Sequence, residues 1–510
     1  MAVDENVVTG TRCGYRKGKK MKRTLAMMIF SAMLLSLCAC SDGGTNPEAA
    51  PAVSGADNSE AAAEPETAWI DTLPDTVKFD GHTFTVGWST PDMNADECAP
   101  NLDDITGDIV GEAVHERNLL VENKLDISIA SNRLTDSWTE VVTELKSLVL
   151  AGDTTYDTYA VGTWFMFQAS INGILHPLSE VGTLDLANDW WEHDLNDMLA
   201  VDGKTHYMAN GMINYLDDYA VSCLYFNKPL CTDLGLEHPY EMVRNGEWTW
   251  DQFLKYVDIS SADLDGNGIY DENDRYGFAE NSGLYCRLLP SFGTPLVMFD
   301  EAGDGIINAS EIFYEQLDQI TTKLLNPDYK AMLLRDGPLG YEKADLVFPG
   351  GRALFFGEMV RNITDFRGSM EQDFGVLPYP KYTEEQAKYY SSYNTVWGTS
   401  YGIPITNLEL DRTGWILEVM GFYSVDTIYP ATIEKNILTK TVRDEESSDM
   451  LSLLFECKFL ELGSWGTSVY NDLCTMAQSG NNNFASSMKR ISKVNQKEFA
   501  EVKNYYDFSN

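Results

Sequence analysis

Short apolar runs alternate with amphipathic helical periods through most of the chain, and this alternation constrains the fold more than any other feature. Strands that alternate with helices are typical of βαβ units with mostly parallel sheets, so the predicted fold class is α/β. The first predicted elements are a strand over 82–88, a helix over 109–125, a strand over 127–130, a helix over 138–150 and a strand over 157–161. After about residue 410 the strand signals fade, and helices are predicted over 450–462 and 484–505.

Residues 1–39 have the pattern of a secretory signal peptide. A basic run from Arg16 to Arg23 precedes an apolar stretch from Leu25 to Leu37, which is too short to cross a bilayer. The stretch ends in Leu37-Cys38-Ala39-Cys40, which resembles a bacterial lipobox and implies that Cys40 is diacylated and becomes the first mature residue. The alternative is an ordinary signal peptide that contains cysteines. We therefore expect a lipid-anchored protein on the extracellular face of the bacterial cell membrane.

Residues 40–68 form a segment rich in Ala, Pro, Gly, Ser and acidic residues, without an aromatic residue. Such a segment cannot bury enough apolar surface to order itself, so it is predicted to be a disordered tether. The whole chain carries 37 Lys and Arg against 78 Asp and Glu, a net charge of −41. This charge repels phosphate backbones and anionic lipids, which excludes nucleic acid as a partner and leaves the lipid anchor as the contact with the membrane.

One catalytic motif is present, the nucleophile-elbow pattern GxSxG at Gly398-Thr399-Ser400-Tyr401-Gly402. That motif needs a helix directly after the serine, and Pro404 opposes one, so a glycine-rich strand is the favoured interpretation. The six histidines show no metal-binding spacing, and HExxH, CxxC, GxGxxG and Walker patterns do not occur. We therefore predict that the protein is not an enzyme. The paired carboxylates of a glycosidase leave no sequence signature, so that alternative stays open.

Several short motifs follow one another in a fixed order between residues 202 and 380. They are Asp202-Gly203-Lys204, Leu224-Tyr225-Phe226-Asn227-Lys228, Trp248-Thr249-Trp250-Asp251-Gln252-Phe253, Tyr276-Gly277-Phe278, Phe348-Pro349-Gly350-Gly351-Arg352-Ala353-Leu354 and Phe374-Gly375-Val376-Leu377-Pro378-Tyr379-Pro380. This series resembles the extracellular solute-binding proteins of ABC importers, of the maltodextrin-binding type. The resemblance implies a two-lobe, periplasmic-binding-protein-like type II fold, with the ligand in the cleft between the lobes. The implied parts are lobe 1 over 69–215 and about 380–430, lobe 2 over 222–373, and C-terminal helices over 431–510 that pack on the lobes.

Aromatic and polar side chains stand where the resemblance places the cleft. Sugars bind to flat aromatic faces and to groups that accept hydrogen bonds from hydroxyls, and ligands of open α/β sheets bind at the carboxyl ends of strands. Each candidate has a structural alternative: an aromatic residue in a lobe core, a carboxylate facing water, or a surface helix pair for Glu358 and Arg361. The candidates are Trp88, Ser89, Trp164, Phe165, Asp217, Asp218, Tyr219, Glu358, Arg361, Tyr393, Trp397 and Trp465.

The segment from Asp263 to Asp274 has the pattern of a calcium-binding loop. Oxygen side chains stand at loop positions 1, 3, 5, 9 and 12, glycine stands at position 6, and position 7 offers a backbone carbonyl. The alternative is a solvated acidic loop. Any bound calcium is expected to be structural, and no other cofactor is expected. The candidate ligands are Asp263, Asp265, Asn267, Ile269, Asp271 and Asp274, with Asp replacing the usual Glu at the last position.

Together these features predict a lipid-anchored, extracellular substrate-binding subunit of an ABC transporter. It is expected to be a monomer that captures a carbohydrate by lobe closure and delivers it to the permease subunits in the membrane. One alternative is a secreted surface glycosidase or polysaccharide-processing lipoprotein, and another is a binding protein for peptides or another non-sugar solute. The six cysteines that follow Cys40 are expected to be mostly buried free thiols.

Overall fold

The computed structural model describes the chain from Trp69 onward, with gaps. The predicted signal peptide, the lipidated Cys40 and the tether therefore lie outside the described residues. Within the described part of the chain, no helix is long and apolar enough to cross a membrane. The described residues are 69–74, 76–89, 98–99, 107–200, 205–213, 216–268, 270–271, 273–280, 283–299, 305–325, 332–334, 346–432, 445–461, 468–479 and 486–493.

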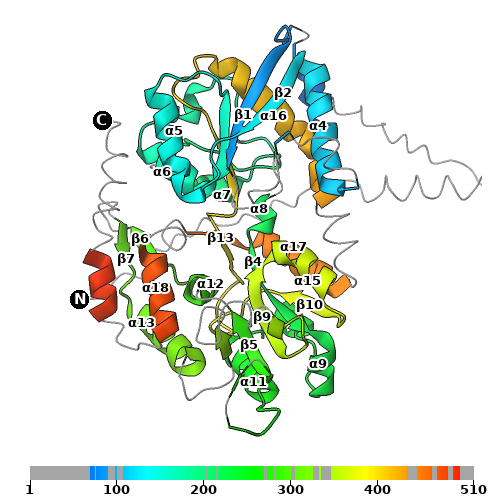
Figure 1. Cartoon of the computed structure of the whole chain (residues 1–510), viewed down its shortest axis with the longest axis vertical. Helices are drawn as coiled ribbons and strands as arrows, with labels where there is room; N and C mark the ends of the chain where they lie inside the picture. The colour runs from blue at the N-terminus through cyan, green and yellow to red at the C-terminus, as the bar shows by residue number, and fades with distance from the viewer. Residues whose placement is uncertain are drawn as a thin grey trace, which may run out of the picture. The chain divides into compact units, whose positions relative to one another are not determined.

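The first sheet has four strands in the order β12-β3-β1-β2. β1 is parallel to both β2 and β3, whereas β12 is antiparallel to β3. Figure 1 shows α5 and α6 on one side of this sheet and α4 on the other, and α16 packs against α4. The elements are β1 (His82–Ser89), β2 (Ile127–Arg133), β3 (Thr158–Gly162), β12 (Thr399–Gly402), α4 (Ile109–Leu125), α5 (Val141–Leu150), α6 (Thr163–Ile171) and α16 (Leu410–Ser424).

Two aspartates bound helix α4, which coincides with the predicted helix. Asp108 is the N-cap residue, and its Oδ1 accepts a hydrogen bond from the Val110 backbone N–H at 3.1 Å. Asp126 ends the helix in the left-handed conformation, with φ of 55°. Between these caps Val110, Val114 and Val121 are buried at helical spacing together with Arg117, so one face of the helix packs on the core.

The second sheet has five strands in the order β10-β4-β9-β5-β8. β5 is parallel to β8 and β9, whereas β4 is antiparallel to β9 and β10, so the prediction of mostly parallel sheets is wrong for this sheet. Every residue of β4, β5 and β9 is buried, so polar residues do not alternate with apolar ones in these strands, and the pattern carries no sign of strand direction. The strands are β4 (Ser222–Asn227), β5 (Tyr276–Glu280), β8 (Met332–Leu334), β9 (Ala353–Met359) and β10 (Phe374–Leu377).

An aromatic core centred on Trp248 joins the second sheet to helix α11. The Trp248 ring is fully buried, packs edge-on against Phe253 and Tyr256, and donates from Nε1 to the Pro378 carbonyl at 3.1 Å. The helices of this part of the chain are α9 (Lys228–Asp233), α10 (Tyr240–Arg244), α11 (Trp250–Ser260), α12 (Leu284–Ser291), α13 (Glu311–Ile320) and α15 (Ile363–Ser369). The remaining short elements are α2 (Trp69–Thr72), η1 (Trp138–Glu140), η2 (Leu178–Glu180), α7 (His193–Leu199), α8 (Leu216–Tyr219), β6 (Val297–Phe299), β7 (Gly305–Ile307), η3 (Thr321–Leu325) and η4 (Val360–Asn362).

The C-terminal part contains a strand that the sequence did not indicate. Helix α17 (Glu445–Glu456) ends six residues before the predicted end of that helix, and β13 (Lys458–Leu460) follows it. β13 forms because β11 (Ser391–Tyr393) offers a parallel edge, a partner that is far away in sequence. Helix α18 (Ser468–Ser479) comes next, and 486–493 are helical within the predicted 484–505 segment. The six mature-body cysteines are all buried thiols, as expected.

Two chain segments connect the first sheet to the second, and these segments lie next to each other. The first leads through α8 into β4, and the second leads from β10 through β11 to β12. Val221 forms an isolated bridge with Tyr393, and the Asn394 N–H donates to the Ala220 carbonyl at 3.0 Å. We call this pair of connections the hinge. The proposed boundaries of the lobes stay predictions.

Candidate functional site

The three parallel strands of the first sheet end at one edge, where sequence reasoning places a ligand. Trp88 and Ser89 end β1, and both side chains are buried. The guanidinium of Arg133, at the end of β2, lies 5.9 Å from the centre of the Trp88 ring. Phe165, at the start of α6, is also buried in a hydrophobic cluster. The structure thus places Trp88 and Phe165 within the packed interior behind this edge.

Trp138 is an exposed aromatic residue at the same edge, and its sequence pattern predicts only the start of a helix. It follows β2 in η1, is 53% exposed, and its ring centre lies 6.3 Å from that of Phe165. An exposed tryptophan is unusual because its large apolar face is normally buried. The signal that could have found it is its place after a predicted strand, the criterion that selected Trp88.

Three of the predicted aromatic residues are half-buried on one hydrophobic cluster: Trp164, Tyr219 and Trp397. Trp164 is the second residue of α6, which follows β3 of the first sheet, and its backbone N–H donates to the Thr395 carbonyl at 2.8 Å, two residues from Trp397. The Arg361 guanidinium, in η4 after β9 of the second sheet, lies 3.7 Å from the centre of the Trp397 ring. The structure therefore brings predicted residues from both sheets and from the hinge together.

Glu358 is a buried residue of a strand, so the alternative of a surface helix pair with Arg361 is wrong. Glu358 lies inside β9, is buried, and accepts a hydrogen bond from Arg287 Nη2 at 2.8 Å. The other Arg287 nitrogen, Nη1, donates to Glu280 at 2.5 Å. The Glu358 carboxylate is buried because strand β9 continues through Glu358 and Met359, two residues beyond the end of the apolar run. Trp465 lies outside the described residues.

Asp217 is buried at the hinge within a polar network. Its Oδ1 accepts hydrogen bonds from the Tyr393 hydroxyl at 2.6 Å and from Asn210 Nδ2 at 3.0 Å. Among the described residues its Oδ2 has no hydrogen-bond partner. Burial raises the pKa of Asp217 to about 7, although Tyr393, Lys458 and Asn210 act in the opposite direction.

Asp218, the next residue, belongs to an ion-paired group. The Lys458 ammonium on β13 lies 2.7 Å from Asp218 Oδ1 and 2.8 Å from Glu192 Oε1. Burial raises the pKa of Asp218, whereas Lys458 lowers it. Neither Lys458 nor Glu192 is a predicted site residue, and the helical period over 450–462 predicts a helix where Lys458 lies on β13.

Ser400 of the GxSxG pattern is a buried residue of strand β12. Its hydroxyl donates to Asn210 Oδ1 at 2.6 Å and lies 2.9 Å from Thr163 Oγ1. Neither partner is a general base, and the strand continues to Gly402 without a helix. The arrangement agrees with the interpretation of this motif as a strand.

The acidic loop between α11 and β5 brings three predicted calcium ligands together. One carboxylate oxygen each from Asp263, Asp265 and Asp274 lies within 4.8 Å of the others. Calcium–oxygen distances are about 2.3–2.6 Å, so oxygens on opposite sides of one ion are about 4.6–5.2 Å apart. Asp263 accepts from the backbone N–H groups of Gly266 and Gly268, which lowers its pKa. The donor set and spacing fit calcium. Ile269 lies outside the described residues.

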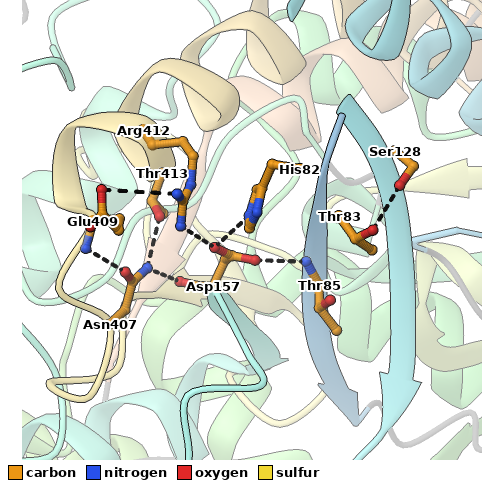
Figure 2. Close-up of polar contacts among 9 residues, drawn as sticks. All are labelled: His82, Thr83, Thr85, Ser128, Asp157, Asn407, Glu409, Arg412 and Thr413. Atoms are coloured by element: carbon orange, nitrogen blue, oxygen red, sulfur yellow. Dashed lines mark hydrogen bonds and ion pairs between the residues drawn. The ribbon is translucent and has the colours of Figure 1, made fainter. Parts of the chain in front are cut away.

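A separate polar cluster lies at the opposite edge of the first sheet, shown in Figure 2. Asp157, which precedes β3, accepts from the Thr85 N–H at 2.9 Å and lies 3.1 Å from His82 Nε2. Arg412 of α16 approaches the same carboxylate at 3.5 Å, and Asn407 donates to the Asp157 carbonyl at 2.8 Å. These contacts attach α16 to the amino ends of the strands, away from the predicted ligand edge.

A cavity of about 670 Å³ lies beside α10 and α17. None of the predicted ligand-binding residues lines it. The buried Lys381 ammonium at its wall donates to the Glu384 and Gln386 carbonyls at 3.1 and 3.0 Å. These contacts fold the loop that forms the wall.

No protein-family model and no curated protein sequence matches the chain. Solved structures do match it. A sugar transporter from Rhizobium etli in an open conformation is 12% identical, with a TM-score of 0.53 over 82% of this chain and 99% of its own. UgpB from Mycobacterium tuberculosis in complex with glycerophosphocholine is 14% identical, with a TM-score of 0.52 over 82% and 98%. A family 1 extracellular solute-binding protein from Bifidobacterium longum subsp. infantis is 14% identical, with a TM-score of 0.52 over 83% and 100%.

These likenesses show the fold. The chain has the two-lobe, periplasmic-binding-protein-like α/β fold, and the expectation from its motifs is confirmed at that level.

Proposed function

We propose that the protein is the lipid-anchored, extracellular substrate-binding subunit of an ABC transporter. It captures a carbohydrate by closure of its lobes and delivers it to a permease in the membrane. The observation that carries this proposal is the meeting of Trp164, from the helix after β3, with the hinge segment that holds Trp397, on which Arg361 from the segment after β9 lies. Half-buried groups from both sheets at one place are what closure around a solute requires.

A sugar is the solute class that these side chains favour. The half-buried Trp164 ring and the exposed Trp138 ring offer apolar surfaces for the C–H faces of a pyranose ring, whereas Arg361 covers one face of Trp397. Arg361 offers hydrogen-bond donors held in place by its stacking on Trp397. Solved proteins of this fold include one described as a sugar transporter and one in complex with glycerophosphocholine, so both solute types belong in the test.

A thermal-unfolding screen of the mature chain against sugars, glycerophosphodiesters and peptides tests this function. A solute at about 100 times its Kd stabilises the native state by about 2.7 kcal/mol. We expect a sugar to give this stabilisation and to be recovered unchanged. Stabilisation by peptides alone would contradict the sugar assignment, and steady cleavage of a glycoside would contradict the binding function.

Two further features belong to the same proposal. We propose that Cys40 carries the lipid that holds the protein at the outer face of the membrane, since Leu37-Cys38-Ala39-Cys40 has the lipobox pattern. The loop from Asp263 to Asp274 is proposed to bind one structural calcium ion, supported by the spacing of its carboxylates.

A further inference from the structure

Six polar side chains form what we call the hinge cluster: Glu192, Asn210, Asp217, Asp218, Tyr393 and Lys458. The cluster joins several parts of the fold, and Figure 1 draws α8 and β13 between the two sheets. Asp217 and Asp218 lie on α8, which leads into β4, and Tyr393 lies on β11. Lys458 lies on β13, directly after α17, and α17 packs on β10 of the second sheet. A movement of the sheets about the hinge therefore acts on this cluster.

The hinge cluster contains three carboxyl groups but one ammonium group. The Lys458 ammonium forms ion pairs with Asp218 and Glu192, at 2.7 and 2.8 Å. Asp217 is left with the two neutral donors Tyr393 and Asn210, both on Oδ1, and its Oδ2 has no partner among the described residues. An ionised carboxylate in this position would be buried without a direct counter-ion, which is costly.

The other titratable groups around Asp217 do not relieve this imbalance. Burial raises the pKa of the Tyr393 phenol, which keeps its proton and remains a donor. Glu192 and Asp218 are negative and disfavour a further negative charge. Arg361, on the η4 segment that packs on α8, has its guanidinium on the Trp397 ring. Lys458 is thus the cation that lowers the pKa of Asp217, and its ammonium is already ion-paired with two other carboxylates.

We propose that the Asp217 carboxyl group holds a proton up to neutral pH and that release of this proton to solvent loosens the hinge. The burial that raises the pKa of Asp217 to about 7 supports this placement of the proton. Ionised Asp217 adds a third negative charge and competes for Lys458, which weakens the bridge from β13 to Glu192. Opening of the hinge admits water to Asp217 and relieves the charge. Alkaline pH therefore favours the open form.

Infrared difference spectroscopy of the unlipidated mature chain tests the proton directly. Between about pH 5.5 and about pH 8.5 we expect the carbonyl band of a protonated carboxylic acid to disappear with a midpoint near the Asp217 pKa. Asp217→Asn should remove this change. Burial also raises the pKa of Glu418, so Glu418→Gln is the matched control and should leave the Asp217 band in place. A band missing from the native protein, or kept in Asp217→Asn, would overturn the proposal.

Distance measurements test the coupling to the hinge. In a Cys40→Ser background, spin labels at Leu150→Cys on α5 and Ile259→Cys on α11 report the separation of the sheets, because both positions are exposed while the six cysteines from Cys98 onward are buried. We expect the longer-distance population to rise at least about twofold between about pH 6 and about pH 8 in the native background but not with Asp217→Asn. Distances that do not change with pH would overturn the coupling.

The coupling rests on the lobe movement of the proposed function, whereas the proton does not. Failure to find any solute would contradict the proposed function and leave the infrared result unaffected. An unperturbed carboxyl at Asp217 would contradict this inference and leave solute binding unaffected.

Discussion

At the scale of single residues, the hinge depends on the place of the Tyr393 ring. Tyr393 is buried, donates to Asp217 and packs on Gly398, at the start of the GxSxG pattern. A Cβ atom at Gly398 would overlap the Tyr393 hydroxyl. The glycine is therefore required by close approach of a side chain.

Gly398→Ala is expected to destabilise the protein by about 1–3 kcal/mol, because Tyr393 must move and lose its hydrogen bond to Asp217. Gly368→Ala is the matched control. Gly368 lies in helix α15 with nothing within 4 Å of an added Cβ, so alanine should be neutral or slightly stabilising. Urea unfolding of both variants measures the difference, and equal stabilities would contradict the packing argument.

Asp217→Asn tests the cost of the buried carboxyl. The folded pKa of about 7 lies above the ordinary value of 3.8, so the folded state binds this proton more tightly than the unfolded state. The stability that the group contributes is full below about pH 4 and is lost as pH rises to about 7, by up to about 4 kcal/mol. The native protein should therefore lose this stability relative to Asp217→Asn across that window. Parallel pH profiles of the unfolding free energy would count against a raised pKa.

Trp164→Ala and Trp397→Ala are expected to weaken binding of the sugar found by the screen by about tenfold or more each, with folding intact. Each truncation removes a half-buried ring that the proposal places against the solute. Leu150→Ala, at an exposed position on α5, is the control that should leave affinity unchanged. Calorimetric titration measures the affinity of each variant for the sugar. Unchanged affinity in both tryptophan variants would contradict the placement of these rings against the solute.

At the scale of elements, the acidic loop joins α11 to β5. Gly266 and Gly268 adopt φ of 71° and 78°, which lets their N–H groups point at Asp263. The carboxylates of Asp263, Asp265 and Asp274 then gather on one side of the loop. A cation there would offset their mutual repulsion.

Calcium is expected to bind this loop in chelator-treated protein with one-to-one stoichiometry and to raise Tm. Asp263→Asn together with Asp265→Asn should abolish the uptake, because the ion loses two charged ligands. A control double change at Glu384→Gln and Glu385→Gln removes two exposed acidic charges elsewhere. Heat of binding that persists in the loop variant, or is absent from the native protein, would exclude the site.

At the scale of the whole molecule, net charge bears on the proposed lipid anchor. A chain of net charge −41 is repelled by anionic lipid, so the proposed place at the membrane requires a covalent anchor. Cys40→Ser should therefore release the protein from the membrane fraction into the medium with its fold unchanged. Fractionation of cells that express each form measures this, and retention of the variant at the membrane would contradict the lipid anchor.

The sequence was informative wherever structure is set locally. Helix α4 coincides with its prediction because Asp108, Asp126 and the spacing of its apolar residues are all local signals. The strands of the first sheet were found for the same reason. Strand β13 was missed because a three-residue strand exists only against β11, from a segment more than sixty residues earlier in the chain.

The candidate site divides in the same way. Sequence position selected Trp164, Arg361 and Trp397, and the structure brings them together. The position of a residue in the sequence could not reveal that Trp88 and Phe165 are buried or that Trp138 is exposed. It also could not reveal that Glu358 pairs with Arg287.

The amino-acid order by itself determined the α/β class, the boundaries of helix α4 and the motif series of the two-lobe fold, because helix periods and caps are short-range properties of the chain. Only the tertiary structure decided strand direction in the second sheet and the grouping of Asp217, Tyr393 and Lys458. Such contacts join residues far apart in sequence, and burial then sets the charge that each side chain carries.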